Sequence, residues 1–328
     1  MATNVDTYQP ITLPLDAVKP TTQASPPPPT TSPLSSNSTT VTINPSIKAP
    51  FNAIRSLFDH LYTNPDTAKE LNATYPRRGI LKTAATHNTT SDQKFTIDIS
   101  GPRCALMPEA IRIALAPHGL PEVLEFFNTV STTYIPPVLS HLNSLSGLDL
   151  HSVHRDYNVN LRLADYNPLT ASPDSLNGCG AHTDYGTFTI IFQDGTPGLE
   201  LEEISPCGKK TWAPVPGDAT VILTGWCAVI LSGGRIKAAR HRVRRMPGVR
   251  RLSAILFLAP DLDVPLAPLE GVEPVRAFSE LVMEGEMKVG EFKEVMGKRW
   301  RYREGNEEME GGRGQFDQDA EIERLIYA

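Results

Sequence analysis

The sequence predicts a β-sandwich or jelly roll with helices packed around it. The main indication is a series of short β-rich segments, separated by Gly, Pro and Asp turns, that begins after residue 158. A second indication is the helical spacing of apolar residues on both sides of this series. The expected strands are 160–166, 187–192, 198–203, 219–223, 228–231, 239–243 and 251–259.

The rest of the chain divides into three parts around this core of residues 158–262. Residues 1–45 are expected to be largely disordered, apart from a short strand over 11–16. Residues 21–40 are almost entirely Thr, Ser and Pro, which bury too little apolar surface to offset the entropy of ordering. Residues 46–157 are expected to be mainly helical. Residues 263–328 are expected to form C-terminal helices.

The composition narrows the class of protein. The chain has 328 residues and a net charge of −6, with mixed charges and no polybasic segment, so neither nucleic acid nor a membrane is expected as a partner. No apolar run is long enough to span a bilayer, and no secretory signal is visible. Four scattered cysteines without paired spacing favour a reduced, cytoplasmic protein. A monomer is favoured, although the sequence does not fix the oligomeric state.

A candidate metal site follows from three residues in the β-rich part. His182 and Asp184 are two residues apart, so in an extended chain their side chains project to the same side. His241 lies in another expected strand and completes the donor set of a two-His-one-carboxylate triad. Each residue alone has a simpler explanation as a structural or exposed side chain. The joint pattern, in its strand context, favours a metal site.

The motifs His182-x-Asp184, His241 and Arg251-x-Ser253 resemble the signature of the Fe(II)/2-oxoglutarate-dependent dioxygenases of the isopenicillin N synthase-like family. The resemblance extends over most of the chain from about residue 90. It implies a double-stranded β-helix, which is a jelly roll wrapped by helices. It also implies Fe(II), 2-oxoglutarate and O2 as cofactor and co-substrates. Arg251 and Ser253 would hold the far carboxylate of 2-oxoglutarate, because a guanidinium offers a planar fork of donors.

The chain departs from the family before the metal motif. The family has Asn-x-Tyr there, with the Tyr hydroxyl on 2-oxoglutarate, whereas this chain has Asp165-Tyr166-Asn167. Asn167 is therefore assigned to the contact with 2-oxoglutarate, and a re-aimed Tyr166 is the alternative.

Strand alternation gives a candidate substrate pocket. Its residues would be one acid among apolar side chains: Asp165, Leu163, Phe188, Ile255 and Phe257. A buried acid favours a cationic or hydroxylated partner, such as an amino acid or amine. The alternative is that Asp165 binds only backbone or Arg162.

The leading functional prediction is an oxygenase for a small organic substrate, such as an amino acid or a specialised metabolite. It would hydroxylate, desaturate or cyclise that substrate while 2-oxoglutarate yields succinate and CO2. One alternative is an iron oxidase that uses O2 without 2-oxoglutarate. A second alternative is a non-catalytic binding module on the same fold.

Overall fold

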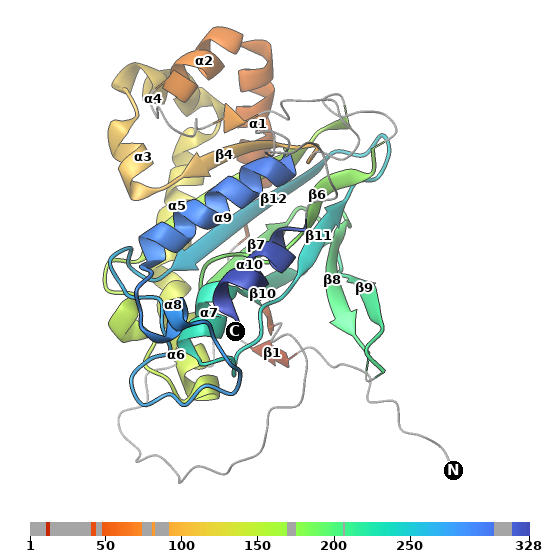
Figure 1. Ribbon diagram of the computed structural model, residues 1–328. Coiled ribbons are helices and arrows are strands. Elements are labelled where there is room, and N and C mark those ends of the chain that lie inside the picture. Colours follow the sequence, from red (N-terminus) through yellow and green to blue (C-terminus); the bar gives the residue numbers. More distant parts are fainter. Residues whose placement is uncertain are drawn as a thin grey trace.

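Two β-sheets face each other across the core of the molecule, and helices cover its outside (Figure 1). The computed structural model describes residues 11–13, 41–43, 48–73, 81–82, 92–168, 175–205, 207–304 and 317–328. The prediction of a mainly β protein with a jelly-roll core and flanking helices is confirmed. The segment 21–40 lies outside the described residues, so its predicted disorder stays a prediction.

The larger sheet has eight strands and the smaller sheet has four. The order in the larger sheet is β1 (Ile11–Leu13), β2 (Val41–Ile43), β10 (Thr220–Thr224), β7 (Phe188–Gln193), β12 (Arg251–Ala259), β5 (Asn158–Tyr166), β4 (Phe95–Ile99) and β3 (Leu81–Lys82). The order in the smaller sheet is β6 (Asn177–His182), β11 (His241–Arg244), β8 (Leu199–Ile204) and β9 (Lys210–Pro214). All neighbouring strands are antiparallel except β1 and β2.

Helices from both ends of the chain surround this core. The N-terminal group comprises α1 (Phe51–Thr63), α2 (Pro65–Ala73), α3 (Gly101–Leu106), α4 (Glu109–Leu115), α5 (Leu120–Thr133) and α6 (Ile135–Ser146). The later helices are α7 (Trp226–Leu231), α8 (Glu280–Met283), α9 (Val289–Glu304) and α10 (Gln318–Ile326). In Figure 1, α9 lies across the front of β12, on the side of the sheet away from α5.

The local sequence explains where α5 and α6 begin and end. Both helices carry proline in the first turn, where a missing N–H costs nothing. Pro136 and Pro137 therefore lie in the first turn of α6, and they do not interrupt a single long helix. Gly147 ends α6 with φ 72°, a left-handed conformation that favours glycine.

The two faces of the larger sheet bury different side chains. Leu161, Leu163, Phe188, Ile190 and Phe192 join the apolar core shared with the N-terminal helices. A separate apolar cluster lies between the two sheets and includes Ala164, Tyr166, Ile191, Leu199 and Val243. Because side chains alternate along a strand, each residue belongs to one core or the other.

This alternation corrects two of the predicted pocket residues. Leu163 and Phe188 are fully buried in the core on the helix side, so their prediction as pocket residues is wrong. For Phe188 the reason is the turn formed by residues 185–187, which separates the metal motif from β7. The regular alternation of side-chain directions that starts at Asp184 therefore does not continue through that turn into β7.

One predicted strand is also wrong. Residues 228–231 belong to helix α7, whose six residues are all buried. An apolar run without alternation does not distinguish a buried strand from a buried helix. Within residues 263–328, the described helices are α8, α9 and α10.

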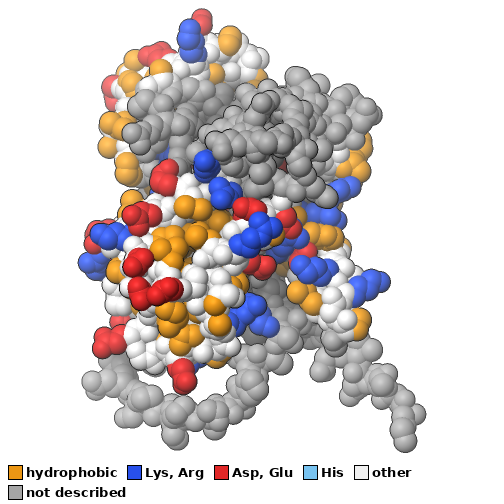
Figure 2. Space-filling model, in the orientation of Figure 1, with side chains coloured by type: hydrophobic (Ala, Val, Ile, Leu, Met, Phe, Trp, Pro, Cys, Tyr) orange, Lys and Arg blue, Asp and Glu red, His pale blue; other side chains and the backbone are white. Residues whose placement is uncertain are grey.

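The surface agrees with the mixed composition. Figure 2 shows hydrophobic side chains near the centre of one face, with acidic and basic side chains interspersed around them. None of the helices in the described ranges combines the length and the apolar run that a membrane crossing needs.

Asp165 lies on the helix side of β5 and is fully buried, so its predicted place in the substrate pocket is wrong. Its carboxylate forms an ion pair with Arg250 at 2.7 Å and accepts a hydrogen bond from the Tyr62 hydroxyl at 2.7 Å. Arg250 also reaches Asp59 on α1 at 2.6 Å. The partner of Asp165 is therefore neither backbone nor Arg162. Through Tyr62 and Arg250, Asp165 links α1 to the larger sheet.

We expect Asp165→Asn to destabilise the protein by about 2 kcal/mol, because it leaves Arg250 partly unpaired in a buried site. Denaturant unfolding measures this change. Asp263→Asn is the control, because the Asp263 side chain is 71% exposed and exposed ion pairs contribute little. If Asp165→Asn instead left stability unchanged and weakened substrate binding, the placement of Asp165 on the helix side of β5 would be contradicted.

His154 is a second buried polar group, and its neutral form is satisfied in the fold. Its Nδ1 donates to the Leu150 carbonyl at 2.5 Å, and its Nε2 accepts from the Thr187 hydroxyl at 2.7 Å. Burial lowers the pKa of His154 to about 4. The unfolded chain protonates near pH 6.5, so it holds more protons than the folded state between those two values.

Stability is therefore expected to fall as the pH drops from 6.5 to 4, with a contribution from His154 of about 3 kcal/mol at most. Thermal unfolding of wild type and His154→Gln at a series of pH values measures this contribution. The variant is expected to lose less stability over that window. Equal pH slopes for the two proteins would show that His154 is not the group responsible.

Candidate metal centre

His182, Asp184 and His241 meet between the two sheets. His182 ends β6, His241 begins β11, and the two residues are paired across the smaller sheet. His182 Nε2 lies 3.5 Å from Asp184 Oδ1, and His241 Nε2 lies 3.9 Å from Asp184 Oδ2. All three potential ligand atoms lie within 4.8 Å of one another. Within the described ranges, this is the only group of three or more such side chains close enough to share an ion.

Both imidazoles direct Nε2 toward the Asp184 carboxylate. His182 Nδ1 lies 2.8 Å from the Gly180 carbonyl oxygen, and His241 Nδ1 lies 3.0 Å from that of Ala239. A carbonyl only accepts, so each Nδ1 carries the hydrogen and donates it. Each Nε2 then keeps its lone pair, which is the form that binds a metal.

Asp184 is buried, but its surroundings favour the charged form. The Thr189 hydroxyl on β7 donates to Asp184 Oδ2 at 2.6 Å. Burial alone would raise the pKa of Asp184, but the positive charge that His241 and His182 carry when protonated, together with the hydrogen bond from Thr189, holds it well below its ordinary value. The carboxylate is therefore ionised and available as a ligand.

Asp319, on α10, ties together the two segments that carry these residues. Its carboxylate accepts from the Thr183 backbone N–H at 3.0 Å and from the Thr183 hydroxyl at 3.2 Å. The same carboxylate accepts from Arg240 Nε at 2.9 Å. Thr183 lies between His182 and Asp184, and Arg240 directly precedes His241. One buried carboxylate therefore fixes the chain next to all three candidate ligands.

Arg251 enters the same cavity from the larger sheet and is 3% exposed. Its guanidinium donates to Gln193 Oε1 at 2.9 Å and lies 3.5 Å from the Ser253 hydroxyl. No described carboxylate forms an ion pair with it. His241 and Arg251 come from neighbouring strands of the chain, β11 and β12, but these strands belong to different sheets. The connection between these strands crosses from one sheet to the other, and both side chains still face the cavity.

Tyr166, and not Asn167, lines the cavity beside Arg251, so the assignment of Asn167 is wrong. Tyr166 is the strand partner of Arg251, and the guanidinium carbon lies 5.1 Å from its ring centroid. Burial raises the pKa of Tyr166, so its hydroxyl stays protonated and can donate. Asn167 follows the last residue of β5 and does not line the cavity.

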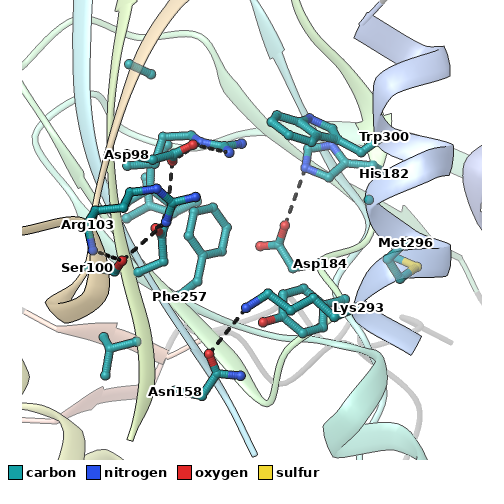
Figure 3. A pocket seen from close by; sticks show the side chains of 18 of the residues that line it. Asp98, Ser100, Arg103, Asn158, His182, Asp184, Phe257, Lys293, Met296 and Trp300 are labelled. Atoms are coloured by element: carbon teal, nitrogen blue, oxygen red, sulfur yellow. Dashed lines mark hydrogen bonds and ion pairs between the residues drawn. The ribbon is translucent and has the colours of Figure 1, made fainter. Parts of the chain in front are cut away.

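The cavity has a volume of about 1010 Å³ and continues from the triad to α9. Ile255 and Phe257 line it, as predicted from the alternation of β12. Figure 3 shows His182 and Asp184 at one side and Phe257 opposite, with side chains of α9 closing the space. Sequence reasoning missed several lining residues from other elements, among them Arg103, Asn158, Arg162, Lys293, Met296 and Trp300.

The donor set fits Fe(II). Two imidazole nitrogens and one carboxylate oxygen on one side of an ion leave positions open toward the cavity, which is the arrangement of non-haem iron oxygenases. The nearby Gln318 side chain also lines the cavity, and its Oε1 is buried without a hydrogen-bond partner. The open side of the candidate site therefore faces polar as well as apolar groups.

Comparison with known proteins agrees with this geometry. Residues 157–260 match the family model of the 2OG-Fe(II) oxygenase superfamily. The similarity to this superfamily lies in the β-rich core of the chain. The matched segment contains all three triad residues as well as Arg251 and Ser253.

Two known proteins are similar in sequence to part of this chain. One is the 2-oxoglutarate-dependent dioxygenase tropC of Talaromyces stipitatus, with 40% identity over 34% of this chain and 34% of that protein. The other is scopoletin 8-hydroxylase of Arabidopsis thaliana, with 32% identity over 45% of this chain and 42% of that protein. The chain therefore spans less than half the length of either relative.

A solved structure extends the likeness to most of the fold. Neurospora crassa T7H, crystallised with alpha-KG, superposes with a TM-score of 0.57. The superposition covers 77% of this chain and 84% of that one, at 19% identity. At this identity the comparison establishes the fold alone.

We expect Asp319→Asn to weaken binding of a divalent metal by about tenfold, because groups that orient metal ligands typically contribute that much. Calorimetric titration of the metal-free protein with Co(II) measures the dissociation constant. The replacement keeps the shape of the side chain. It removes the negative charge of Asp319, to which Arg240 and Thr183 donate hydrogen bonds.

Glu202→Gln is the matched control, since Glu202 also binds Arg240, at 2.8 Å, but does not touch Thr183. It is expected to leave Co(II) affinity within about twofold of wild type. If both variants lost Co(II) affinity equally, the loss would follow from any weakening of the ion pairs of Arg240. Asp319 would then have no particular role.

Proposed function

We propose that this protein is an Fe(II)/2-oxoglutarate-dependent oxygenase that oxidises a small organic substrate. The observation that carries the proposal is the convergence of His182, Asp184 and His241 in a cavity that Arg251 also enters. The superfamily match to residues 157–260 and the T7H structure crystallised with alpha-KG support it.

The residues have distinct roles in this proposal. His182 Nε2, His241 Nε2 and an oxygen of Asp184 would hold Fe(II), with the Nδ1–H bonds fixing both rings. Arg251 would bind the far carboxylate of 2-oxoglutarate, assisted by the Ser253 hydroxyl. Tyr166 would donate a further hydrogen bond from its protonated hydroxyl. These groups provide the charge-assisted contacts that a buried dicarboxylate needs.

Bound Fe(II) would supply the redox chemistry in which O2 oxidises the substrate while 2-oxoglutarate is converted to succinate and CO2. The chain's own contribution is to position and enclose the reactants. The buried walls around Arg251 exclude water from the co-substrate, which strengthens its electrostatic contacts. A cytoplasmic location and a monomeric state stay predictions from the sequence.

Succinate formation tests the proposal directly. The wild-type protein with Fe(II), 2-oxoglutarate and O2 is expected to release succinate, slowly without substrate and faster with it. His241→Ala is expected to abolish both metal binding and succinate release, because it removes one of three ligands. Succinate release at an undiminished rate from His241→Ala would contradict the proposed site.

Arg251→Lys tests the co-substrate anchor. A point charge replaces a planar fork, so a charge-assisted hydrogen bond of about 1.5–3 kcal/mol is lost. The apparent constant for 2-oxoglutarate is expected to rise about tenfold or more, while Co(II) affinity stays near that of wild type. An unchanged dependence on 2-oxoglutarate, with altered substrate affinity, would favour an iron oxidase that does not use 2-oxoglutarate.

A further inference from the structure

Tyr157 has an unusual backbone conformation at one end of the cavity. Its φ angle is 44°, and among the residues that the structure describes it is the only one other than glycine with a positive φ. The left-handed conformation brings Cβ close to the following carbonyl oxygen, so a bulky side chain adopts it only at a cost in free energy. Glycine adopts it without that cost. The presence of tyrosine here therefore needs a reason other than the local backbone.

The chain on both sides of Tyr157 is tied to the segment that follows β12. The two oxygens of the Asp261 carboxylate accept the backbone N–H groups of the two residues before Tyr157, at 3.0 and 3.1 Å. The next residue, Asn158, donates from its side chain to the Pro260 carbonyl at 3.1 Å. A strained conformation persists when the surrounding contacts fix the neighbouring residues in this way.

The Tyr157 side chain contributes little to the packing of the fold. It is 36% exposed, and it is not part of any apolar cluster formed by the described residues. It does line the cavity that contains the triad. Strained residues are found most often at functional sites, where the strained conformation positions a side chain for its role. A molecule bound in the cavity is therefore the natural partner of this ring.

Tyr157 lies at the open end of the cavity, far from the anchor for 2-oxoglutarate. Its neighbours in the cavity wall, Leu262 and Asp263, are exposed to solvent as well. Tyr166, the strand partner of Arg251, ends β5, and Tyr157 directly precedes that strand. The nine residues of β5 span about 26 Å at roughly 3.3 Å per residue. A five-carbon diacid bound at Arg251 is much shorter, so a molecule that contacts Tyr157 is a different one.

The open end has an apolar rim. Leu262, which is 49% exposed, directly follows Asp261, so the residue that fixes the chain before Tyr157 also places Leu262 beside the cavity. The acidic side chains of Asp261 and Asp263 at this rim are paired with Arg155, at 2.8 and 3.0 Å. Large apolar side chains that stay exposed at the edge of a cavity favour contact with an apolar part of a ligand.

We propose that Tyr157 is a substrate-binding residue that determines which substrates the cavity accepts. Its ring, together with Leu262, contacts an apolar part of the substrate at the open end, and the carbon to be oxidised lies toward the triad. The cavity of about 1010 Å³ is large enough to hold such a substrate beside 2-oxoglutarate. The strained backbone is then explained, because it carries the ring that the substrate meets. The inference rests on the proposed oxygenase function.

The strain itself predicts how stability responds to substitution. Tyr157→Ala removes the ring but keeps Cβ, and therefore keeps the strain, whereas Tyr157→Gly removes both. The glycine variant is expected to melt about 1–2 °C above the alanine variant, because glycine adopts a positive φ without strain. At most positions the order is the reverse, since glycine loses more conformational freedom on folding. Scanning calorimetry of the two variants measures the difference.

Probes of graded length test the contact with the substrate. The protein is loaded with Zn(II) and 2-oxoglutarate, and dissociation constants are measured by calorimetry for 4-ethylphenol, 4-butylphenol and 4-hexylphenol. The wild-type protein is expected to bind more tightly as the apolar chain lengthens. Tyr157→Ala is expected to weaken binding of 4-hexylphenol about tenfold and binding of 4-ethylphenol less than about twofold.

Two further variants serve as controls. Tyr157→Phe keeps the ring and is expected to bind all three probes within about twofold of wild type. Ile113→Ala removes a side chain that is 65% exposed on α4 and does not line the cavity. It is expected to leave the three dissociation constants unchanged.

Three results would overturn the inference: wild-type affinity that does not rise with chain length, an equal effect of Tyr157→Ala on all three probes, or a Tyr157→Gly variant that melts below Tyr157→Ala. Succinate release without added substrate separates this inference from the proposed function. A protein that converts 2-oxoglutarate but binds the probes independently of Tyr157 refutes only the substrate contact. A protein that binds them through Tyr157 but never forms succinate refutes only the oxygenase function.

Discussion

The alternation of side chains along β5, β7 and β12 is the constraint on which the rest of the structure depends. Each strand presents one set of residues to the N-terminal helices and the other set to the space between the sheets. The set that faces the N-terminal helices is apolar apart from the buried Asp165 and its ion pair. The set that faces the space between the sheets provides Arg251, Ser253 and Tyr166. One strand therefore stabilises the protein with one face and forms the cavity with the other.

The triad histidines and Arg251 are oriented by hydrogen bonds to neutral groups of the fold. The Nδ1 atoms of His182 and His241 are occupied by backbone carbonyls, so their Nε2 atoms face the cavity. Gln193 holds Arg251 through one nitrogen, and the guanidinium retains other donors for a ligand. A buried ionic group is costly unless it is satisfied, so such a cavity is expected to be most stable when its ligands are bound.

The sequence was sufficient for the fold class, for most of the strands and for the residues of the triad. Their signals are local, since His182 and Asp184 are two residues apart and β12 alternates without interruption from Arg251 to Phe257. Predictions failed where a side chain's direction depends on a turn or on the register of a strand. Phe188 lies beyond the turn at 185–187, and Tyr166 and Asn167 exchange roles if β5 is read one residue out of register.

Other residues of the cavity had no sequence signal at all. Arg103, Lys293 and Trp300 come from helices that pack against the sheet only in the folded chain, and their charges and rings are ordinary for helix surfaces. Asp319 reads as an acidic residue in the first turn of a helix, where such residues are common. Only the tertiary structure shows that it meets Thr183 and Arg240.

The long sequence separation between Thr183 and Asp319 has a consequence for the order in which the site is made. The two residues lie 136 positions apart. At roughly 5–20 residues per second, a ribosome needs roughly 7–27 s to reach Asp319 after Thr183 has been translated. During this interval the two sheets can begin to pair while the segments that carry His182 and His241 are not yet tied together. Tight capture of a metal is therefore expected only after Asp319 has been translated and has met Thr183.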